Sequence, residues 1–131
     1  MIPEPLFLIN KKKINCYSNV CTHRGNILID KPCIIKKDIV CRYHGKQFDT
    51  CGKYKFMPKT EGMKNFPTVK DNLPSVPIAK WRQFIFTSLD PKFGFNELIQ
   101  EVEKRVGWMP IENFNYNADL SKEYVVNANW A

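Results

Sequence analysis

Two short segments of the chain carry side chains that bind metal ions. The first contains Cys21 and His23, and the second contains Cys41 and His44. Each segment offers one thiolate and one imidazole, and a glycine follows each histidine within two residues. The sequence has two histidines in all, and both fall into this pattern of C-x-H and, seventeen residues later, C-x-x-H. Thiolate and imidazole are donors that zinc and iron–sulfur centres take from proteins.

This donor set fits a [2Fe–2S] cluster of the Rieske type. In such a centre two cysteines bind one iron and two histidines bind the other. We therefore predict that Cys21, His23, Cys41 and His44 are the metal and cofactor ligands, held on two matching hairpin loops. The glycine after each histidine would let the backbone turn beneath the sulfur atoms, where amide N–H groups can donate hydrogen bonds to them.

Two other interpretations of the four residues exist. Two cysteines with two histidines also make a common structural zinc site. Zinc loops usually pair C-x-x-C with H-x-x-x-H, whereas each segment here mixes one cysteine with one histidine. The third interpretation is four unrelated residues, which would make the double pattern a coincidence. The mixed spacing favours the iron–sulfur cluster over a zinc-stabilised binding module.

The elements that must position the two segments read as short strands separated by turns. Gly52 marks one predicted hairpin, between residues 47–49 and residues 53–56. Many short strands with frequent turns predict a mainly β fold, an antiparallel β-sandwich or small barrel with two cluster-binding hairpin loops. The other runs typical of strands, of which the third and fourth should form a hairpin, are residues 6–9, 14–17, 33–35, 38–41 and 81–89.

The pattern changes after Pro91. Apolar residues recur at helical spacing between Phe95 and Val106, which predicts an amphipathic C-terminal helix. Asn96 is the expected N-cap, and Gly107 is expected to end the helix.

These patterns suggest a division of the chain. We predict a Rieske [2Fe–2S] domain at residues 1–90. Residues 91–131 would form a linker helix and the start of a further domain, with a strand-like run at residues 124–126.

Composition narrows the class of protein. The 131 residues contain no apolar run near the ~20 residues of a membrane span, and the N-terminus does not resemble a signal peptide. We therefore expect a cytoplasmic protein with no membrane partner. The net charge of +7 is scattered, which indicates solvated surface with some role in docking an acidic redox partner and argues against nucleic-acid binding. Five cysteines, an odd number, argue against a disulfide framework, and we expect Cys16, Cys33 and Cys51 not to be ligands.

The two metal-binding segments resemble the Rieske domain of ring-hydroxylating and related Rieske non-haem iron oxygenases. The resemblance covers nearly the whole chain. It rests on CTHRG at residues 21–25 and CRYHG at residues 41–45, and continues through these further segments: residues 18–20, 47–49, 52–53, 57–58, 66–67, 73–74, 81–91 and 126–130.

The resemblance implies one-electron transfer as the domain through which electrons enter an oxygenase. A reductase or ferredoxin would be the donor. The acceptor would be a mononuclear non-haem Fe(II), held by two histidines and a carboxylate in a catalytic domain of the same or a neighbouring subunit of a trimer. Both histidines of this chain are committed to the cluster, so that domain should lie beyond Ala131, and the resemblance also implies further sequence before Leu6. No catalytic residue is therefore assigned here, and the chain alone should not be a competent oxidoreductase.

A stand-alone Rieske ferredoxin is the alternative to an oxygenase domain. The helix predicted after Pro91 favours the oxygenase, because a minimal ferredoxin could stop near Leu89.

Three positions near the ligands bear on the reduction potential. High-potential Rieske proteins of respiratory complexes carry an extra cysteine in each loop and a serine after the second His-Gly. The equivalent positions here are Asn26, Tyr43 and Lys46. Fewer hydrogen bonds to the sulfur atoms should lower the potential, and the resemblance thus implies a value near the low end of the Rieske range, around −150 mV.

Overall fold

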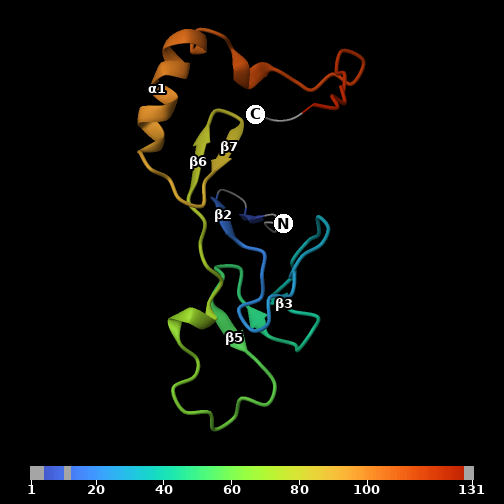
Figure 1. Cartoon of the computed structure of the whole chain (residues 1–131), viewed down its shortest axis with the longest axis vertical. Helices are drawn as coiled ribbons and strands as arrows, with labels where there is room; N and C mark the ends of the chain where they lie inside the picture. Colours follow the sequence, from blue (N-terminus) through green and yellow to red (C-terminus); the bar gives the residue numbers. More distant parts are fainter. Residues whose placement is uncertain (1–4, 11–12, 129–131) are drawn as a thin grey trace. The chain divides into compact units, whose positions relative to one another are not determined.

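The computed structural model describes residues 5–10 and 13–128 (Figure 1). Its strands are β1 (Pro5–Asn10), β2 (Lys13–Ser18), β3 (Ile39–Val40), β4 (Gln47–Phe48), β5 (Tyr54–Phe56), β6 (Ile78–Trp81) and β7 (Phe84–Thr87). Its helices are the α-helix α1 (Phe95–Val106) and the short 3₁₀ helices η1 (Val69–Asp71) and η2 (Ile111–Asn113). Within this described part, no helix combines the length and the apolar character that crossing a membrane requires.

The strands form three small sheets. β1 pairs antiparallel with β2, and β3, β4 and β5 form an antiparallel sheet in that order. β6 and β7 form the third sheet. This mainly β architecture with a helix toward the C-terminus confirms the predicted fold class.

The described residues separate into two compact units. The first contains the residues up to Ala79 together with Ile85–Lys92. The second contains Lys80–Phe84 and the residues from Phe93 onward. The division at residues 90 and 91 made from the sequence stays a prediction.

The core of the first unit includes the two candidate ligand cysteines. Gly52 lies against the ring of Tyr17, where an added Cβ would stand 2.7 Å from a ring carbon, and its φ of +72° suits glycine. This close approach places the turn between β4 and β5 directly against the core. The buried residues of the core are Tyr17, Cys21, Leu28, Ile39, Cys41, Phe48 and Leu73.

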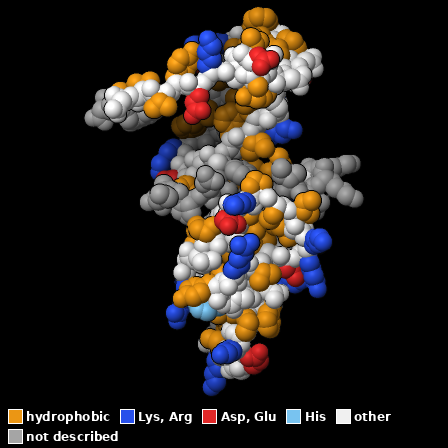
Figure 2. All heavy atoms as spheres, turned by 90° about the vertical axis from the view of Figure 1, so that its right-hand side faces the viewer, with side chains coloured by type: hydrophobic (Ala, Val, Ile, Leu, Met, Phe, Trp, Pro, Cys, Tyr) orange, Lys and Arg blue, Asp and Glu red, His pale blue; other side chains and the backbone are white. Residues whose placement is uncertain are grey.

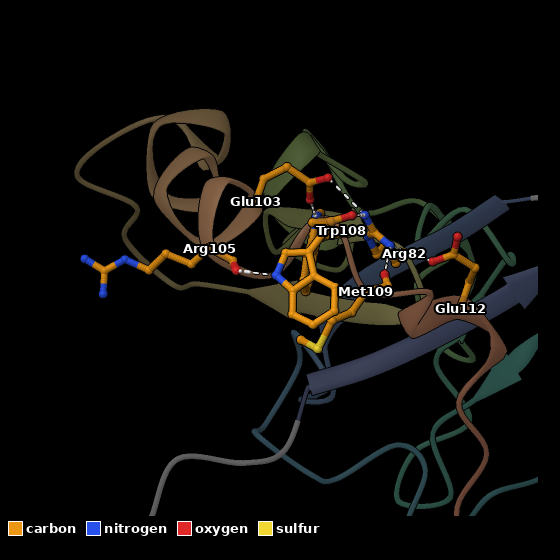
Figure 3. A network of polar contacts seen from close by, with 8 residues as sticks. Arg82, Glu103, Arg105, Trp108, Met109 and Glu112 are labelled. Carbon is orange, nitrogen blue, oxygen red and sulfur yellow. Dashed lines mark hydrogen bonds and ion pairs between the residues drawn. The ribbon is translucent and has the colours of Figure 1, made fainter.

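Arg82 organises the second unit (Figure 3). Its guanidinium donates hydrogen bonds to the carboxylates of Glu103 at 3.0 Å and Glu112 at 2.7 Å. It also donates to the backbone carbonyl oxygens of Gly107 at 2.8 Å and Met109 at 2.9 Å. One side chain therefore satisfies carbonyl groups at and just beyond the C-terminal end of α1, where helices leave such groups without intrahelical partners.

Helix α1 confirms the helix that the apolar periodicity predicted, and it ends where predicted. Gly107 is the C-cap, and its N–H donates to the carbonyl oxygen of Glu103 at 2.8 Å. The prediction that Asn96 is the N-cap was wrong. The helix begins at Phe95 with Gly94 as the N-cap, in an extended conformation, so that Asn96 already lies in the first turn.

Three strand predictions were wrong. Residues 33–35 form no strand, because β3 pairs with β4 across the loop at 41–46 instead. The run at 81–89 is interrupted by a turn at Arg82, whose φ is +51°, and becomes the end of β6 followed by β7. Residues 124–126 are exposed and irregular, and an isolated apolar run does not form a strand without a partner.

Candidate metal centre

The two candidate loops, residues 21–26 and residues 41–46, share one backbone design. In the first, the N–H of Cys21 donates to the carbonyl of Asn26 at 2.8 Å. In the second, the N–H of Cys41 donates to the carbonyl of Lys46, also at 2.8 Å. An antiparallel residue pair closes each loop at its base. The loops thus place their cysteines at equivalent positions.

Glycine at the fifth position completes each loop. Gly25 donates its N–H to the carbonyl of Cys21 at 3.0 Å, and Gly45 donates to that of Cys41 at 2.9 Å. The φ angles of Gly25 and Gly45 are +70° and +73°, in the region that residues with a Cβ adopt at a cost. The role predicted for these glycines is confirmed in its conformational part, because both have a positive φ and turn the chain within two residues of the histidines.

Cys21 and Cys41 lie together in the core. Each is 2% exposed, and both belong to the same cluster of buried residues. Burial raises the pKa of the Cys21 thiol; a hydrogen bond from the backbone at His23 lowers it, and the neighbouring Cys41 raises it again. Two adjacent thiolates repel each other, and a bound metal cation removes this penalty. The pair is thus suited to holding one metal as thiolates.

His23 and His44 form a second pair. Their ring centroids are 4.7 Å apart at an interplanar angle of 71°, and the ring of Tyr43 packs on His44 at 3.7 Å. Burial lowers the pKa of His23, and the charges of His44, Arg24 and Lys46 lower it further. Neutral imidazole is the metal-binding form. Histidine surface is visible on the face in Figure 2, with hydrophobic side chains beside it.

The four predicted ligands therefore come together as two pairs, one of cysteines and one of histidines. Within residues 5–10 and 13–128, no three His, Cys, Asp or Glu side chains converge as a site for a single metal ion. In a Rieske cluster two cysteines bind one iron and two histidines bind the other. The donor arrangement fits the two-iron cluster.

The remaining cysteines have no part in these pairs. Cys16 is buried, Cys33 and Cys51 are exposed, and all three are free thiols. Burial raises the pKa of the Cys16 thiol, and a hydrogen bond with the hydroxyl of Thr87 opposes this effect. Buried thiols of this kind behave as small apolar groups.

Lys46 is the feature of the site that the sequence did not reveal. It is only 1% exposed, and its ammonium lies 2.9 Å from Oδ1 of Asp71. The ammonium also lies 5.7 Å from the ring centroid of Phe48 and 5.5 Å from that of Tyr54. A lysine that follows His-Gly in a polar loop reads as a surface residue. Its partner is 25 positions away, and no local pattern links the two.

Asp71 connects both loops from outside. Its carboxylate receives Lys46 of the second loop, and its backbone carbonyl accepts a hydrogen bond from the hydroxyl of Thr22 in the first loop at 2.8 Å. The N–H and hydroxyl of Thr68 donate to Oδ2 of Asp71 at 2.9 and 3.1 Å. Burial raises the pKa of Asp71, but the hydrogen bonds from Lys46 and Thr68 outweigh it and hold the pKa below its usual value. Asp71 is thus an ionised carboxylate in the fold.

A cavity of about 430 Å³ opens beside the histidine pair. Both histidines line it, together with Lys46, Asp71 and the apolar side chains of Met63 and Phe66. The histidine edge of the candidate centre therefore borders a largely apolar hollow.

Comparisons with known proteins agree with this geometry. A model of the Rieske [2Fe–2S] domain matches residues 1–67. The carnitine monooxygenase oxygenase subunit of Escherichia coli (strain K12) is 30% identical over 93 residues, which cover 70% of this chain and 25% of that protein. The chloroplastic choline monooxygenase of Amaranthus tricolor is 35% identical over 82 residues, covering 60% of this chain and 17% of that one. The chain thus spans about a quarter or less of these relatives.

The fold is also found in solved structures. The apo form of the quaternary ammonium Rieske monooxygenase CntA matches with a TM-score of 0.68 at 19% identity, covering 77% of this chain and 30% of that one. This likeness concerns the fold. The family model covers both loops and all four candidate ligands, and it extends over more than half of the sequence. The chain belongs to the Rieske [2Fe–2S] domain family.

Proposed function

We propose that Cys21, His23, Cys41 and His44 hold a Rieske [2Fe–2S] cluster and that the chain transfers single electrons. The observation that carries this proposal is the sorting of the four residues into a buried thiol pair and a histidine pair on two loops of equal backbone design. When bound, the cluster would supply one-electron redox chemistry.

The protein side chains divide the work of this centre. The buried cysteines hold their half of the site away from water, which disfavours loss of the metal and side reactions. His23 is exposed and His44 is half-buried, so the electron would leave or arrive through the histidine edge. An imidazole N–H at this edge could donate to a carboxylate of a docked domain.

The chain is best explained as one domain of a Rieske non-haem iron oxygenase. The relatives named above are oxygenases, and this chain spans about a quarter of the E. coli subunit. Another solved structure, of a quaternary ammonium Rieske monooxygenase, is described as informative about inter-subunit electron transfer in that protein. By analogy, this domain would receive electrons from a reductase or ferredoxin. It would pass them to a mononuclear Fe(II) in a catalytic domain of a neighbouring subunit of a trimer, with residues 91–131 as the connection.

Cluster binding can be tested on the purified chain. Anaerobic preparation should give about two irons and about two labile sulfides per chain, with the EPR signal of a reduced Rieske centre. Cys41→Ser and His44→Ala should lose the cluster. Cys51→Ser, at an exposed cysteine outside the loops, is the matched control and should keep it. Zinc without iron, or a cluster that survives both ligand substitutions, would refute the proposal.

A separate test addresses the oxygenase context. The coding sequence beyond residue 131 should specify two closely spaced histidines and a later aspartate for the mononuclear iron. A stop codon directly after this segment would instead support the stand-alone ferredoxin. This outcome would leave the cluster assignment intact.

A further inference from the structure

A buried cation lies at the edge of the candidate centre. Lysine is almost never fully buried unless it is paired, and Lys46 is 1% exposed with Asp71 as its ion-pair partner at 2.9 Å. The aspartate side chain is 18% exposed, so the positive end of the pair is the more deeply buried one. The pair therefore places a positive charge, balanced by Asp71, inside the first unit.

Stability alone is a poor reason for this arrangement. Removing two charges from water costs several kcal/mol per ion, and replacing a buried pair by apolar residues of similar size is often neutral or stabilising. The ammonium of Lys46 lies 5.7 Å from the ring centroid of Phe48 and 5.5 Å from that of Tyr54, so that an apolar side chain would find aromatic neighbours there. The charge itself is thus the property to explain.

The position of Lys46 connects that charge to the ligands. Its backbone carbonyl accepts the hydrogen bond from the N–H of Cys41 at 2.8 Å, and Lys46 lines the same cavity as His23 and His44. Lys46 therefore borders candidate ligands of both kinds. Asp71 holds the ammonium in place while it also receives Thr22 from the other loop.

We propose that Lys46 and Asp71 form a positioning pair that sets the reduction potential of the cluster, with Lys46 favouring the reduced state and Asp71 moderating that effect. The inference rests on the proposed cluster at Cys21, His23, Cys41 and His44. The charge of Lys46 would raise the reduction potential, whereas the small number of hydrogen bonds expected at the sulfur atoms would lower it.

The physical basis is electrostatic. One electron arrives from a reduced donor protein, either a flavin-containing reductase or a ferredoxin, and that donor is oxidised by one electron. The charge of the site falls by one, and no bond or proton needs to move. A nearby positive charge in a medium of low dielectric stabilises this added negative charge, and a negative charge opposes it. The two members of the pair must then have opposite effects.

The test compares potentials of the cluster-loaded chain by EPR-monitored titration with dithionite. Lys46→Met, which keeps the stem and removes the charge, should lower the potential. We expect roughly a tenfold fall in the equilibrium constant for reduction, which is about 59 mV for one electron. Asp71→Asn should raise the potential, and the double variant should lie between the two. Lys46→Arg keeps the charge and should stay close to the wild type.

Lys55 supplies the matched control. It pairs with Asp38 at 2.8 Å in the same unit, but its side chain is 41% exposed. Lys55→Met should leave the potential unchanged. Shifts of the same sign for Lys46→Met and Asp71→Asn, or no shift for either, would overturn the inference and leave a purely structural pair. If Lys46→Met does not fold, the rise expected for Asp71→Asn decides.

The two proposals fail in different ways. A wild-type chain without iron and sulfide would refute the proposed function and this inference together. A wild-type chain with a Rieske EPR signal but without opposite shifts would refute this inference alone.

Discussion

The loop at residues 21–26 and the loop at residues 41–46 have nearly the same backbone and very different surroundings. At the sixth position the first loop has Asn26, whose amide donates to the adjacent carbonyl of Ile27 and stays at the surface. The second has Lys46, which is buried and reaches Asp71. Similar chain geometry thus supports one self-contained loop and one loop that depends on a distant partner.

The second position of the loops shows the reverse contrast, because here the first loop contacts Asp71 and the second does not. Thr22 in the first loop donates a hydrogen bond to Asp71. Arg42 in the second loop is exposed, and its nearest carboxylate, on Asp30, is 3.9 Å away. Each loop therefore has one tether to Asp71, at a different position. The comparison teaches that the ligand motif determines the backbone, whereas single side chains around it determine the electrostatic setting.

The largest expected difference between the loops concerns the sixth position. Lys46→Ala should destabilise the fold by about 2–4 kcal/mol, because it leaves the carboxylate of Asp71 without its cation and opens space beside two aromatic rings. Asn26→Ala should cost no more than about 0.5 kcal/mol, because its hydrogen bond is exposed. Urea unfolding of both variants measures this contrast. Equal costs would contradict the unequal roles of the two residues.

The fifth position should behave alike in both loops. Gly25→Ala and Gly45→Ala should each cost about 1–2 kcal/mol, because both glycines have positive φ and neither faces a severe clash. Gly62→Ala is the control, since Gly62 has a φ of +77° outside the loops and open space around it. All three should lose similar stability in urea unfolding, but only the loop variants should lose iron faster during gel filtration. Unaffected iron retention would show that the loops tolerate this strain.

Acid should weaken the ion pair between Lys46 and the carboxylate of Asp71. Because the pKa of Asp71 is lowered in the folded state, its carboxylate stabilises the fold above the ordinary pKa. This stabilisation is lost as the pH falls through the lowered value. Thermal unfolding from about pH 6 to about pH 3 should therefore show a smaller loss for Asp71→Asn than for the wild type. Parallel pH profiles would mean that Asp71 titrates normally.

The second position should give the smallest effects. Thr22→Val should cost about 1 kcal/mol, because it removes a part-buried hydrogen bond to the carbonyl of Asp71. Arg42→Ala should change stability by less than about 0.5 kcal/mol, because both members of its ion pair are largely exposed. A double-mutant comparison of Thr22→Val with Asp71→Asn would show whether the two loops are coupled through this residue.

The backbone turns of the two loops could be predicted from the sequence because their signals are local, whereas the ligand role of the four residues stays a prediction. The spacing of cysteine and histidine and the glycine at the fifth position all act within six residues. The helix at 95–106 followed from its apolar periodicity for the same reason. Features that depend on distant partners were missed, above all the burial of Lys46 by Asp71.

The wrong strands have similar causes. The partner of β3 is decided by the loop between it and β4, not by the apolar residues at 33–35. Arg82 adopts a positive φ without the glycine or asparagine that would announce a turn, and its four hydrogen bonds in the second unit hold it there. No neighbouring residue indicates either outcome.

The burial of Lys46 also determines how the site would respond to salt. Mobile ions weaken the attraction between exposed charges over roughly 8 Å at physiological ionic strength, but they do not reach a side chain that is 1% exposed. Added salt should therefore slow the encounter of this basic chain with an acidic electron donor. If Lys46 sets the reduction potential as proposed, its effect should stay the same in added salt, so that ionic strength would control how often electrons arrive and not how strongly they are held.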